Sequence, residues 1–237
     1  MRRAATGQGK SSRPRSRRGH GDQLRAEILE AVNRLLDEWG SDEKLTMRAV
    51  AEEVGVAAPS IYLHFADKSE LVWAALADKY AQLADVMRTA AEATDGGPRD
   101  RLLAQVHAYC RFALEHPGHY RLMYQVRQPA LDAGKRGHHP SRQVSGRLRR
   151  ALTECAEAGH HLALPLHQCA HTLWTGLHGI VSIQQTMAPA GGSPDGVYAL
   201  ADGLVDALVS CALGTGEAIP RPTEIDRIIA ASVADDD

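Results

Sequence analysis

This chain of 237 residues lacks long apolar runs, cysteine pairs and an apolar leader. No stretch of about 18 apolar residues occurs, so we expect no membrane-spanning helix, and the N-terminus lacks the apolar region of a signal peptide. The four cysteines are dispersed without a C-x-x-C pair, at Cys110, Cys155, Cys169 and Cys211. Such cysteines are typical of reduced, mostly buried thiols, so we expect a cytoplasmic protein.

The chain also lacks the sequence signatures of common enzymes. It has no Gly-rich phosphate loop after a strand, no G-x-S-x-G, no H-E-x-x-H and no internal repeat. β-branched runs are few, whereas Ala, Leu and Arg are frequent, which favours an all-α fold. We therefore expect a helical protein with no catalytic residues, no cofactor and no metal.

The most informative stretch runs from Leu45 to Leu71. It predicts two short helices joined by a tight turn, followed by the start of a longer helix. Thr46 is a good N-cap for the first short helix, and Gly55 supplies the turn. Pro59 falls in the first turn of the second helix, where a missing N–H costs nothing. This pattern predicts a helix-turn-helix, whose second helix can enter the DNA major groove.

The same stretch resembles the DNA-binding domain of the TetR family of bacterial transcriptional regulators. An amphipathic hairpin of an unrelated all-α protein is the alternative, but it leaves exposed Tyr62, His64 and Lys68 without a role. The residues that carry the resemblance are Thr46, Arg48, Ala51, Gly55, Val56, Ile61, Tyr62, His64, Phe65, Lys68 and Leu71.

The resemblance implies a role for each residue of the predicted DNA surface. Phosphates would be held by Thr46 with its backbone N–H groups, and by Tyr62, His64 and Lys68. Arg48 can reach a guanine edge or a phosphate. The residues expected to face the bases are Ala57, Ala58, Pro59 and Ser60. Ala58 stands where other family members place Gln or Lys, so direct readout would be sparse and DNA shape would matter more.

Charge is distributed unevenly around this stretch. No acidic side chain occurs from Val54 to Ala66, as a surface facing phosphates requires. Between Asp22 and Leu71, five Lys or Arg side chains face eleven Asp or Glu side chains. The segment 1–21 instead carries seven Lys or Arg and no acid. We expect 1–21 to be disordered alone; it is either an arm that contacts DNA phosphates or the minor groove, or a solvated tail.

Apolar periodicity predicts the remaining helices. Together with the helix-turn-helix they give about nine helices, a number that matches the TetR architecture. The predicted domains are a helix-turn-helix domain at 22–68, a helical ligand-binding and dimerisation domain at 69–213, and a C-terminal tail at 214–237. The helices are expected at 22–39, 69–93, 99–116, 119–126, 141–158, 165–187 and 195–213, with one further short helix possible at 224–233.

The second half carries a further resemblance. Trp174, His178 and Gly179 match the Trp-x-x-x-His-Gly signature of a TetR subgroup, and Glu115–Tyr124 fits it too. By this resemblance a small-molecule pocket is expected here, although each residue alone is more often plain core. The predicted pocket residues are Tyr109, Phe112, Met123, Tyr124, Trp174, Leu177 and His178.

Histidines are frequent, and His167, His171 and His178 fall roughly on one helix face. The first two have a spacing that can bind a metal, but no Cys, Asp or Glu completes a site within that helix. A histidine face at a helix interface, or partly solvated, is the favoured interpretation. The pairs at 138–139 and 160–161 are expected in exposed loops.

Two-fold DNA half-sites imply a homodimer on a palindromic operator. The helices at 165–187 and 195–213 are the predicted interface, where Gly176 and Gly179 would allow close approach. The favoured function is a DNA-binding transcriptional repressor that a small-molecule effector releases from double-stranded DNA. An activator of the same fold is the alternative, and a histidine-based metal protein or enzyme is a weaker one.

Overall fold

The computed structural model describes residues 20–39, 44–124, 139–187 and 193–210. Within these residues it contains nine helices and one pair of two-residue strands, which confirms the predicted all-α fold. The helices are α1 (His20–Trp39), α2 (Met47–Val54), α3 (Ala58–Tyr62), α4 (Lys68–Glu92), α5 (Pro98–Glu115), α6 (Pro117–Tyr124), α7 (Arg142–Glu157), α8 (Leu166–Met187) and α9 (Asp195–Leu208).

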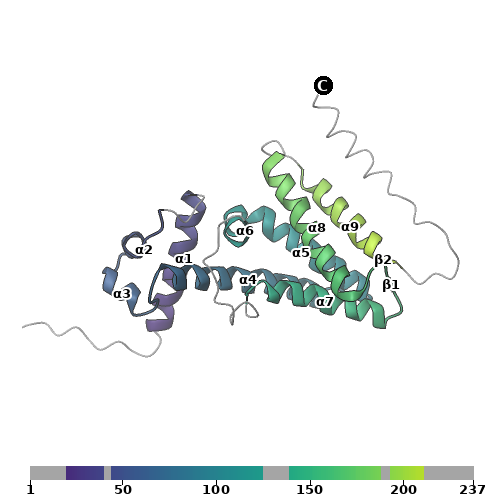
Figure 1. The fold of residues 1–237 in the computed structure, drawn as a ribbon, viewed down its shortest axis with the longest axis horizontal. Coiled ribbons are helices and arrows are strands. Elements are labelled where there is room, and N and C mark those ends of the chain that lie inside the picture. Colours follow the sequence, from purple (N-terminus) through teal and green to yellow (C-terminus); the bar gives the residue numbers. More distant parts are fainter. Residues whose placement is uncertain (1–19, 40–43, 125–138, 188–192, 211–237) are drawn as a thin grey trace, which may run out of the picture.

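The helices form two groups joined by α4. Helices α1, α2 and α3 lie at one end of the molecule, and α4 runs from them into the larger group of α5 to α9 (Figure 1). The first part of α4 packs against α1, and α4 also contacts α5, α6 and α7. One apolar face therefore runs along most of α4, buried at Leu71, Val72, Ala75, Leu76, Tyr80, Leu83 and Met87.

Local chemistry sets several helix boundaries where the sequence predicts them. Asp67 caps α4, because its carboxylate accepts a hydrogen bond from the backbone N–H of Glu70 at 2.8 Å. Helix α5 ends at Glu115, before Pro117. Pro117 itself begins α6, where its missing N–H is harmless, so α6 starts two residues earlier than predicted.

The end of α9 differs from the prediction. The helix ends at Leu208 instead of continuing to 213, because Val209 and Ser210 form strand β2 (Val209–Ser210). Strand β2 pairs antiparallel with β1 (His161–Leu162), so that His161 faces Ser210. The backbone N–H of Ala163 also donates to the carbonyl of Leu208 at 3.0 Å. This pairing ties the α7–α8 connection to the end of α9.

Two expectations about exposure are wrong. His139 was expected in an exposed loop, but it is half-buried, with its ring 5.4 Å from that of Trp73 and 5.9 Å from that of Tyr80. Of the pair at 160–161, His161 is exposed but belongs to β1, and His160 is half-buried. Cys110, Cys155 and Cys169 are buried free thiols, as expected.

The described helices include none that is long and apolar enough to cross a bilayer. The predicted arm at 1–21 lies outside the described residues except for its last two positions, which begin α1. The predicted tail at 214–237, the possible helix at 224–233 and Cys211 also lie outside them.

Candidate functional site

The turn between α2 and α3 is built as the sequence predicts. Thr46 caps α2, and its Oγ1 accepts a hydrogen bond from the backbone N–H of Ala49 at 3.0 Å. Gly55 ends α2 in the left-handed region, with φ of 76°, which favours glycine. The N–H of Val56 then bonds to the carbonyl of Ala51 at 2.9 Å. Because Thr46 is exposed and only accepts in this cap, its hydroxyl hydrogen can still donate to a phosphate.

Helix α3 is short and has one buried side. Ile61 is fully buried and Phe65, just beyond the helix, is 1% exposed, so these two side chains fix α3 on the domain. Ala57 and Pro59 are exposed at its N-terminal end, while Ala58 and Ser60 are half-buried. The four predicted base-facing residues therefore lie together at the start of α3, two of them open to solvent.

Arg48 of α2 is a highly accessible cation. Its Nε lies 2.9 Å from a carboxylate oxygen of Glu52, and the two side chains are 83% and 67% exposed. An ion pair this exposed contributes little to stability. Arg48 can therefore exchange Glu52 for a DNA phosphate or base at small cost.

The remaining phosphate-binding candidates differ in exposure. Tyr62 is 56% exposed, as expected for a DNA contact. His64 and Lys68 are half-buried rather than exposed, because His64 lies toward Gly21 of α1 and Lys68 begins α4. His64 and Lys68 are close to Tyr62 in the sequence, but a smaller fraction of each residue than of Tyr62 is exposed to solvent.

Sequence reasoning missed two residues of this surface. Leu63, directly after α3, is 84% exposed and is the most exposed large apolar side chain among the described residues. Arg25 of α1 places its guanidinium 5.1 Å from the centre of the Phe65 ring. A signal for Leu63 existed, since it falls between Tyr62 and His64 in the TetR-like run, whereas only the fold brings Arg25 to Phe65.

A second candidate site lies between α5, α6 and α8. Tyr120 of α6 is at its centre, with its hydroxyl 2.5 Å from Nδ1 of His178 and 3.5 Å from the hydroxyl of Tyr109. Next to it, Nε1 of Trp174 donates to the hydroxyl of Tyr124 at 3.2 Å. These five side chains form a polar aromatic cluster, in which most polar atoms bond to one another.

Burial keeps this cluster uncharged at neutral pH. Desolvation raises the pKa of Tyr109, Tyr120 and Tyr124 above the ordinary tyrosine range. Desolvation also lowers the pKa of His178. Because the His178 imidazole and the Tyr120 phenol are both neutral, a ligand can replace the hydrogen bond between them without a change in charge.

Four of the seven predicted pocket residues, Tyr109, Tyr124, Trp174 and His178, belong to this cluster. Phe112 instead packs against the rings of His116 and His119, at 5.1 and 6.2 Å. Leu177 and Met123 are fully buried, and the carbonyl of Met123 accepts a hydrogen bond from the Tyr80 hydroxyl. The central residue, Tyr120, was not predicted, although its i, i+4 spacing to Tyr124 was a usable signal.

The histidines of α8 differ in exposure. His167 and His171 are exposed, whereas His178 is half-buried against Tyr120. In the part of the chain that the structure describes, no three His, Cys, Asp or Glu side chains are grouped to hold a metal. The face is thus partly solvated and partly packed at an interface.

Comparison with known families agrees with this geometry. Residues 28–75 match the family described as "Bacterial regulatory proteins, tetR family", and residues 102–208 match "Tetracyclin repressor-like, C-terminal domain". Together these matches cover more than half of the chain. They do not test the Trp-x-x-x-His-Gly subgroup, which stays a prediction.

Individual relatives give the same assignment. The HTH-type transcriptional regulator Rv1816 of Mycobacterium tuberculosis is 29% identical over 118 residues, which are 49% of this chain and 50% of that protein. The chain thus spans about half the length of the curated relatives it matches. A TetR family regulator from Marinobacter aquaeolei VT8 is similar with a TM-score of 0.66 at 19% identity, over 81% of this chain and 99% of that one. A protein of unknown function from Rhodococcus sp. RHA1 is similar with a TM-score of 0.67 at 26% identity, over 79% of this chain and 96% of that one.

These matches also decide between the function classes. The matched families consist of transcription regulators, and the helix-turn-helix built from α2 and α3 falls inside the first matched range. The matched ranges are accordingly those of a transcription regulator family. On its helix-turn-helix, its all-helical architecture and both family matches, the chain belongs to the TetR family of DNA-binding transcriptional regulators.

Proposed function

We propose that this protein is a homodimeric repressor that leaves a palindromic operator when a small molecule binds. The observation that carries the proposal is the solvent-open start of α3, which lies in a stretch of sequence without acidic side chains. Arg48, Tyr62 and the start of α3 are open to solvent there, with no acidic side chain between Val54 and Ala66. A surface of this kind suits docking in a major groove between phosphates.

The polar aromatic cluster supports the ligand-dependent part of the proposal. A ligand with a donor or acceptor can replace the bond between Tyr120 and His178 while Trp174 and Tyr124 cover its apolar part. Since Tyr120 lies on α6, which packs against α1 and α4, its displacement would reach the helix-turn-helix end of the molecule. This arrangement supports the proposed division into a DNA-binding part (22–68) and a ligand-binding part (69–213).

The dimer is proposed to form through α8 and α9. Ile183 and Met187 near the C-terminal end of α8 are 59% and 77% exposed, so they offer apolar surface to a second copy. Gly176, which was predicted to allow close approach at the dimer interface, is not assigned to this contact between copies. A Cβ at this position would lie 2.5 Å from a methyl carbon of Leu204, so Gly176 permits close packing of α8 on α9 within one chain.

Footprinting of the DNA flanking the protein's own gene tests the proposal. We expect a protected, two-fold symmetric sequence at which the protein lowers transcription from a reporter, with protection lost when the effector is added. A protected site at which the protein raises transcription would support the activator alternative. Absence of any protected site at low salt, with folded dimer present, would contradict the assignment of α2 and α3 to DNA.

A further inference from the structure

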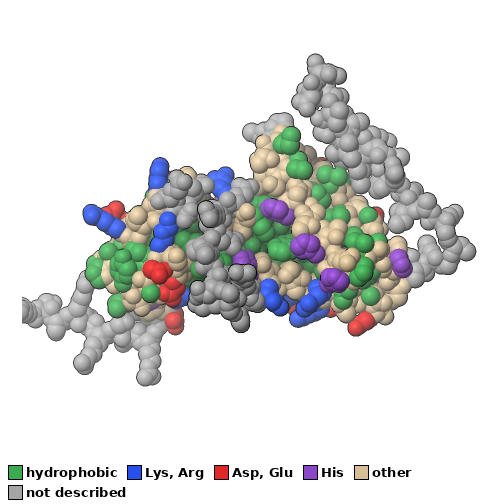
Figure 2. All heavy atoms as spheres, viewed as in Figure 1, with side chains coloured by type: hydrophobic (Ala, Val, Ile, Leu, Met, Phe, Trp, Pro, Cys, Tyr) green, Lys and Arg blue, Asp and Glu red, His purple; other side chains and the backbone are tan. Residues whose placement is uncertain are grey.

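Helix α7 is strongly basic before its last turn. It carries Arg142, Arg147, Arg149 and Arg150, and the first acidic residue of the helix is Glu154. Figure 2 shows Lys and Arg side chains gathered in this region of the surface, beside a row of histidines that follows α8. The proposed repressor function uses none of these arginines.

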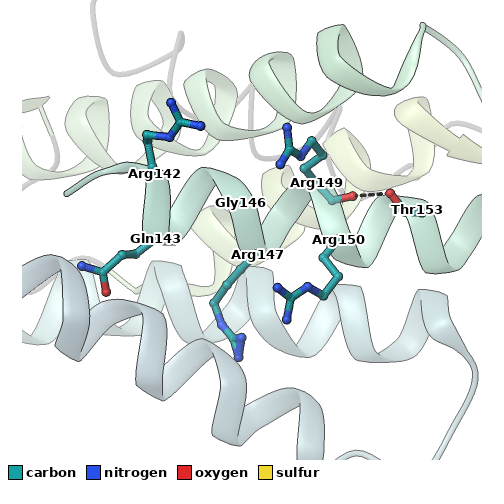
Figure 3. Close-up of a pocket in the computed structure, with 7 residues that line it drawn as sticks. All are labelled: Arg142, Gln143, Gly146, Arg147, Arg149, Arg150 and Thr153. Atoms are coloured by element: carbon teal, nitrogen blue, oxygen red, sulfur yellow. Dashed lines mark hydrogen bonds between the residues drawn. The ribbon is translucent and has the colours of Figure 1, made fainter. Parts of the chain in front are cut away.

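The arginines divide between two sides of α7. In Figure 3, Arg142 and Arg149 point to one side of the helix, while Arg147 and Arg150 point to the other. The side toward α4 is a hollow of about 240 Å³, where Arg147 and Arg150 meet two further arginines, Arg88 and Arg101, and two glutamates, Glu92 and Glu154. Glu92 pairs with Arg88 there, so the two carboxylates offset part of the positive charge on that side.

The side toward α8 is a groove of about 260 Å³ without a carboxylate in its lining. Arg142 and Arg149 are exposed there, and within the described ranges neither side chain forms an ion pair with an acid. Trp174 lines the groove, and its Nε1 already bonds to Tyr124 of the polar aromatic cluster. The groove is lined by Arg142, Ser145, Gly146, Arg149, His167, Ala170, His171 and Trp174.

We propose that this α7–α8 groove binds an organic diphosphate, with phosphates on Arg142 and Arg149 and an attached ring against Trp174. Guanidinium groups bind phosphate oxygens in pairs and form strong charge-assisted hydrogen bonds. The two arginines are seven residues apart, so their Cα atoms are separated by about 10 Å along the helix axis. Arginine side chains are long enough to converge from that separation, so that each guanidinium can bind one of two linked phosphates.

Ring recognition follows from the groove's other wall. Trp174 is half-buried, and the exposed His171 lies beside it, with the two ring centres 6.4 Å apart. Indole and imidazole rings bind planar ligand rings by stacking or edge contacts. The Ser145 hydroxyl adds a neutral donor within the same lining.

Duplex DNA is the competing source of phosphate. The observations disfavour it, because α7 lies in the helical group at the other end of α4 from α2 and α3 (Figure 1). A duplex-binding measurement on the same variants separates these two sources.

Titration calorimetry of the full chain at low ionic strength tests the proposal, with ADP as the ring-bearing probe and pyrophosphate as the ringless one. We expect Arg142→Ala/Arg149→Ala to weaken ADP binding at least about 10-fold, as loss of two charge-assisted contacts implies. Trp174→Leu should weaken ADP binding and leave pyrophosphate binding unchanged. Arg111→Ala is the matched control, since Arg111 is an exposed arginine on α5 outside the groove.

Three outcomes would overturn the proposal. One is ADP binding that is absent at millimolar concentration or unchanged in the double arginine variant. Another is equal weakening by Arg111→Ala, which would reduce the effect to net charge. The third is a loss of duplex DNA affinity in the double arginine variant equal to its loss of ADP affinity. Because ADP binding is measured without DNA, failure here would leave the proposed repressor function standing.

Discussion

At the scale of single residues, the proposed DNA surface separates into two kinds of contact. Tyr62→Ala and Lys68→Ala should weaken binding to all duplexes alike, because phosphates carry no sequence information. Lys68→Ala should also reduce the slope of log affinity against log salt by about one. Fluorescence anisotropy with operator and scrambled duplexes at several salt concentrations measures both effects. An unchanged affinity and salt slope for Lys68→Ala would remove Lys68 from the surface.

Substitutions closer to the bases should act differently. Arg48→Ala and Ser60→Ala are expected to change which bases are preferred, with a loss of discrimination of about 1–3 kcal/mol if Arg48 contacts a guanine edge. Selection of binding sites from a randomised duplex pool shows the change directly. Uniform weakening by Arg48→Ala, with preferences intact, would instead assign Arg48 to a phosphate.

His119 should make folding stability depend on pH. Burial, with the positive charge of Lys79 as a smaller cause, lowers the pKa of His119 to about 4. Because the ordinary value is about 6.5, protonation favours the unfolded chain. The contribution of His119 to the free energy of unfolding is therefore complete above about pH 6.5 and declines as the pH falls toward 4. Denaturation of wild type and His119→Gln over this range should show a shallower decline for the variant, and parallel curves would contradict the shift.

At the scale of elements, packing of α8 on α9 depends on the absence of a side chain at Gly176. Gly176→Leu should destabilise the protein by about 1–3 kcal/mol, because the new side chain meets Leu204. Adding Leu204→Ala should restore part of the loss, since it opens space at the same contact. Urea denaturation of the single and double variants measures both. Equal stability of Gly176→Leu and wild type would show that α9 can move aside without cost.

The boundaries that depend on nearby residues could be predicted from sequence. Thr46, Gly55 and Pro117 each act on backbone groups within a few positions, so α2, the turn after it and the end of α5 lie where expected. The end of α9 could not be predicted, because strand β2 depends on a partner at His161, far earlier in the chain. Gly176 shows the same limit, since a glycine in a helix does not reveal which helix it approaches.

The candidate ligand site was predictable only in part for a similar reason. Aromatic residues on α5, α6 and α8 indicated the region, and four of the seven belong to one cluster. The hydrogen bond of Tyr120 to His178 joins residues 58 positions apart, and no local pattern specifies it. Phe112 lies on the same helix as Tyr109 but faces His116 and His119, because its position on α5 turns it to another side.

At the scale of the whole molecule, effector and operator must weaken each other by one factor if both bias the same conformational equilibrium. Couplings of about 1–3 kcal/mol are typical and correspond to roughly 5–150-fold. Trp174→Ala should reduce the response to effector while operator affinity stays within several-fold, since Trp174 lies on α8, away from α2 and α3 (Figure 1). Operator affinity with and without effector, for both proteins, is the measurement. A full response in Trp174→Ala would remove it from the pocket.

The basic segment before α1 should contribute to DNA binding at long range. Deleting residues 1–19 removes seven Lys or Arg side chains, which should flatten the salt dependence of DNA affinity because fewer counterions are released. The folded part should keep its thermal midpoint. Affinity against salt concentration, with calorimetric melting as the control, tests the arm; an unchanged slope would leave this segment as a solvated tail.

The length of α4 has a mechanical consequence. At 25 residues, the helix is about 37 Å long. Its buried face contacts α1 at one end and α5 and α7 farther along, so it can act as a lever with its fulcrum in the larger helical group. A tilt of about 5° would displace the far end of such a rod by about 3 Å. In the proposed dimer, the two α3 helices must stay about 34–36 Å apart to meet successive major grooves. A displacement of this size would change that spacing, so the length of α4 alone could turn a small movement near Tyr120 into release from DNA.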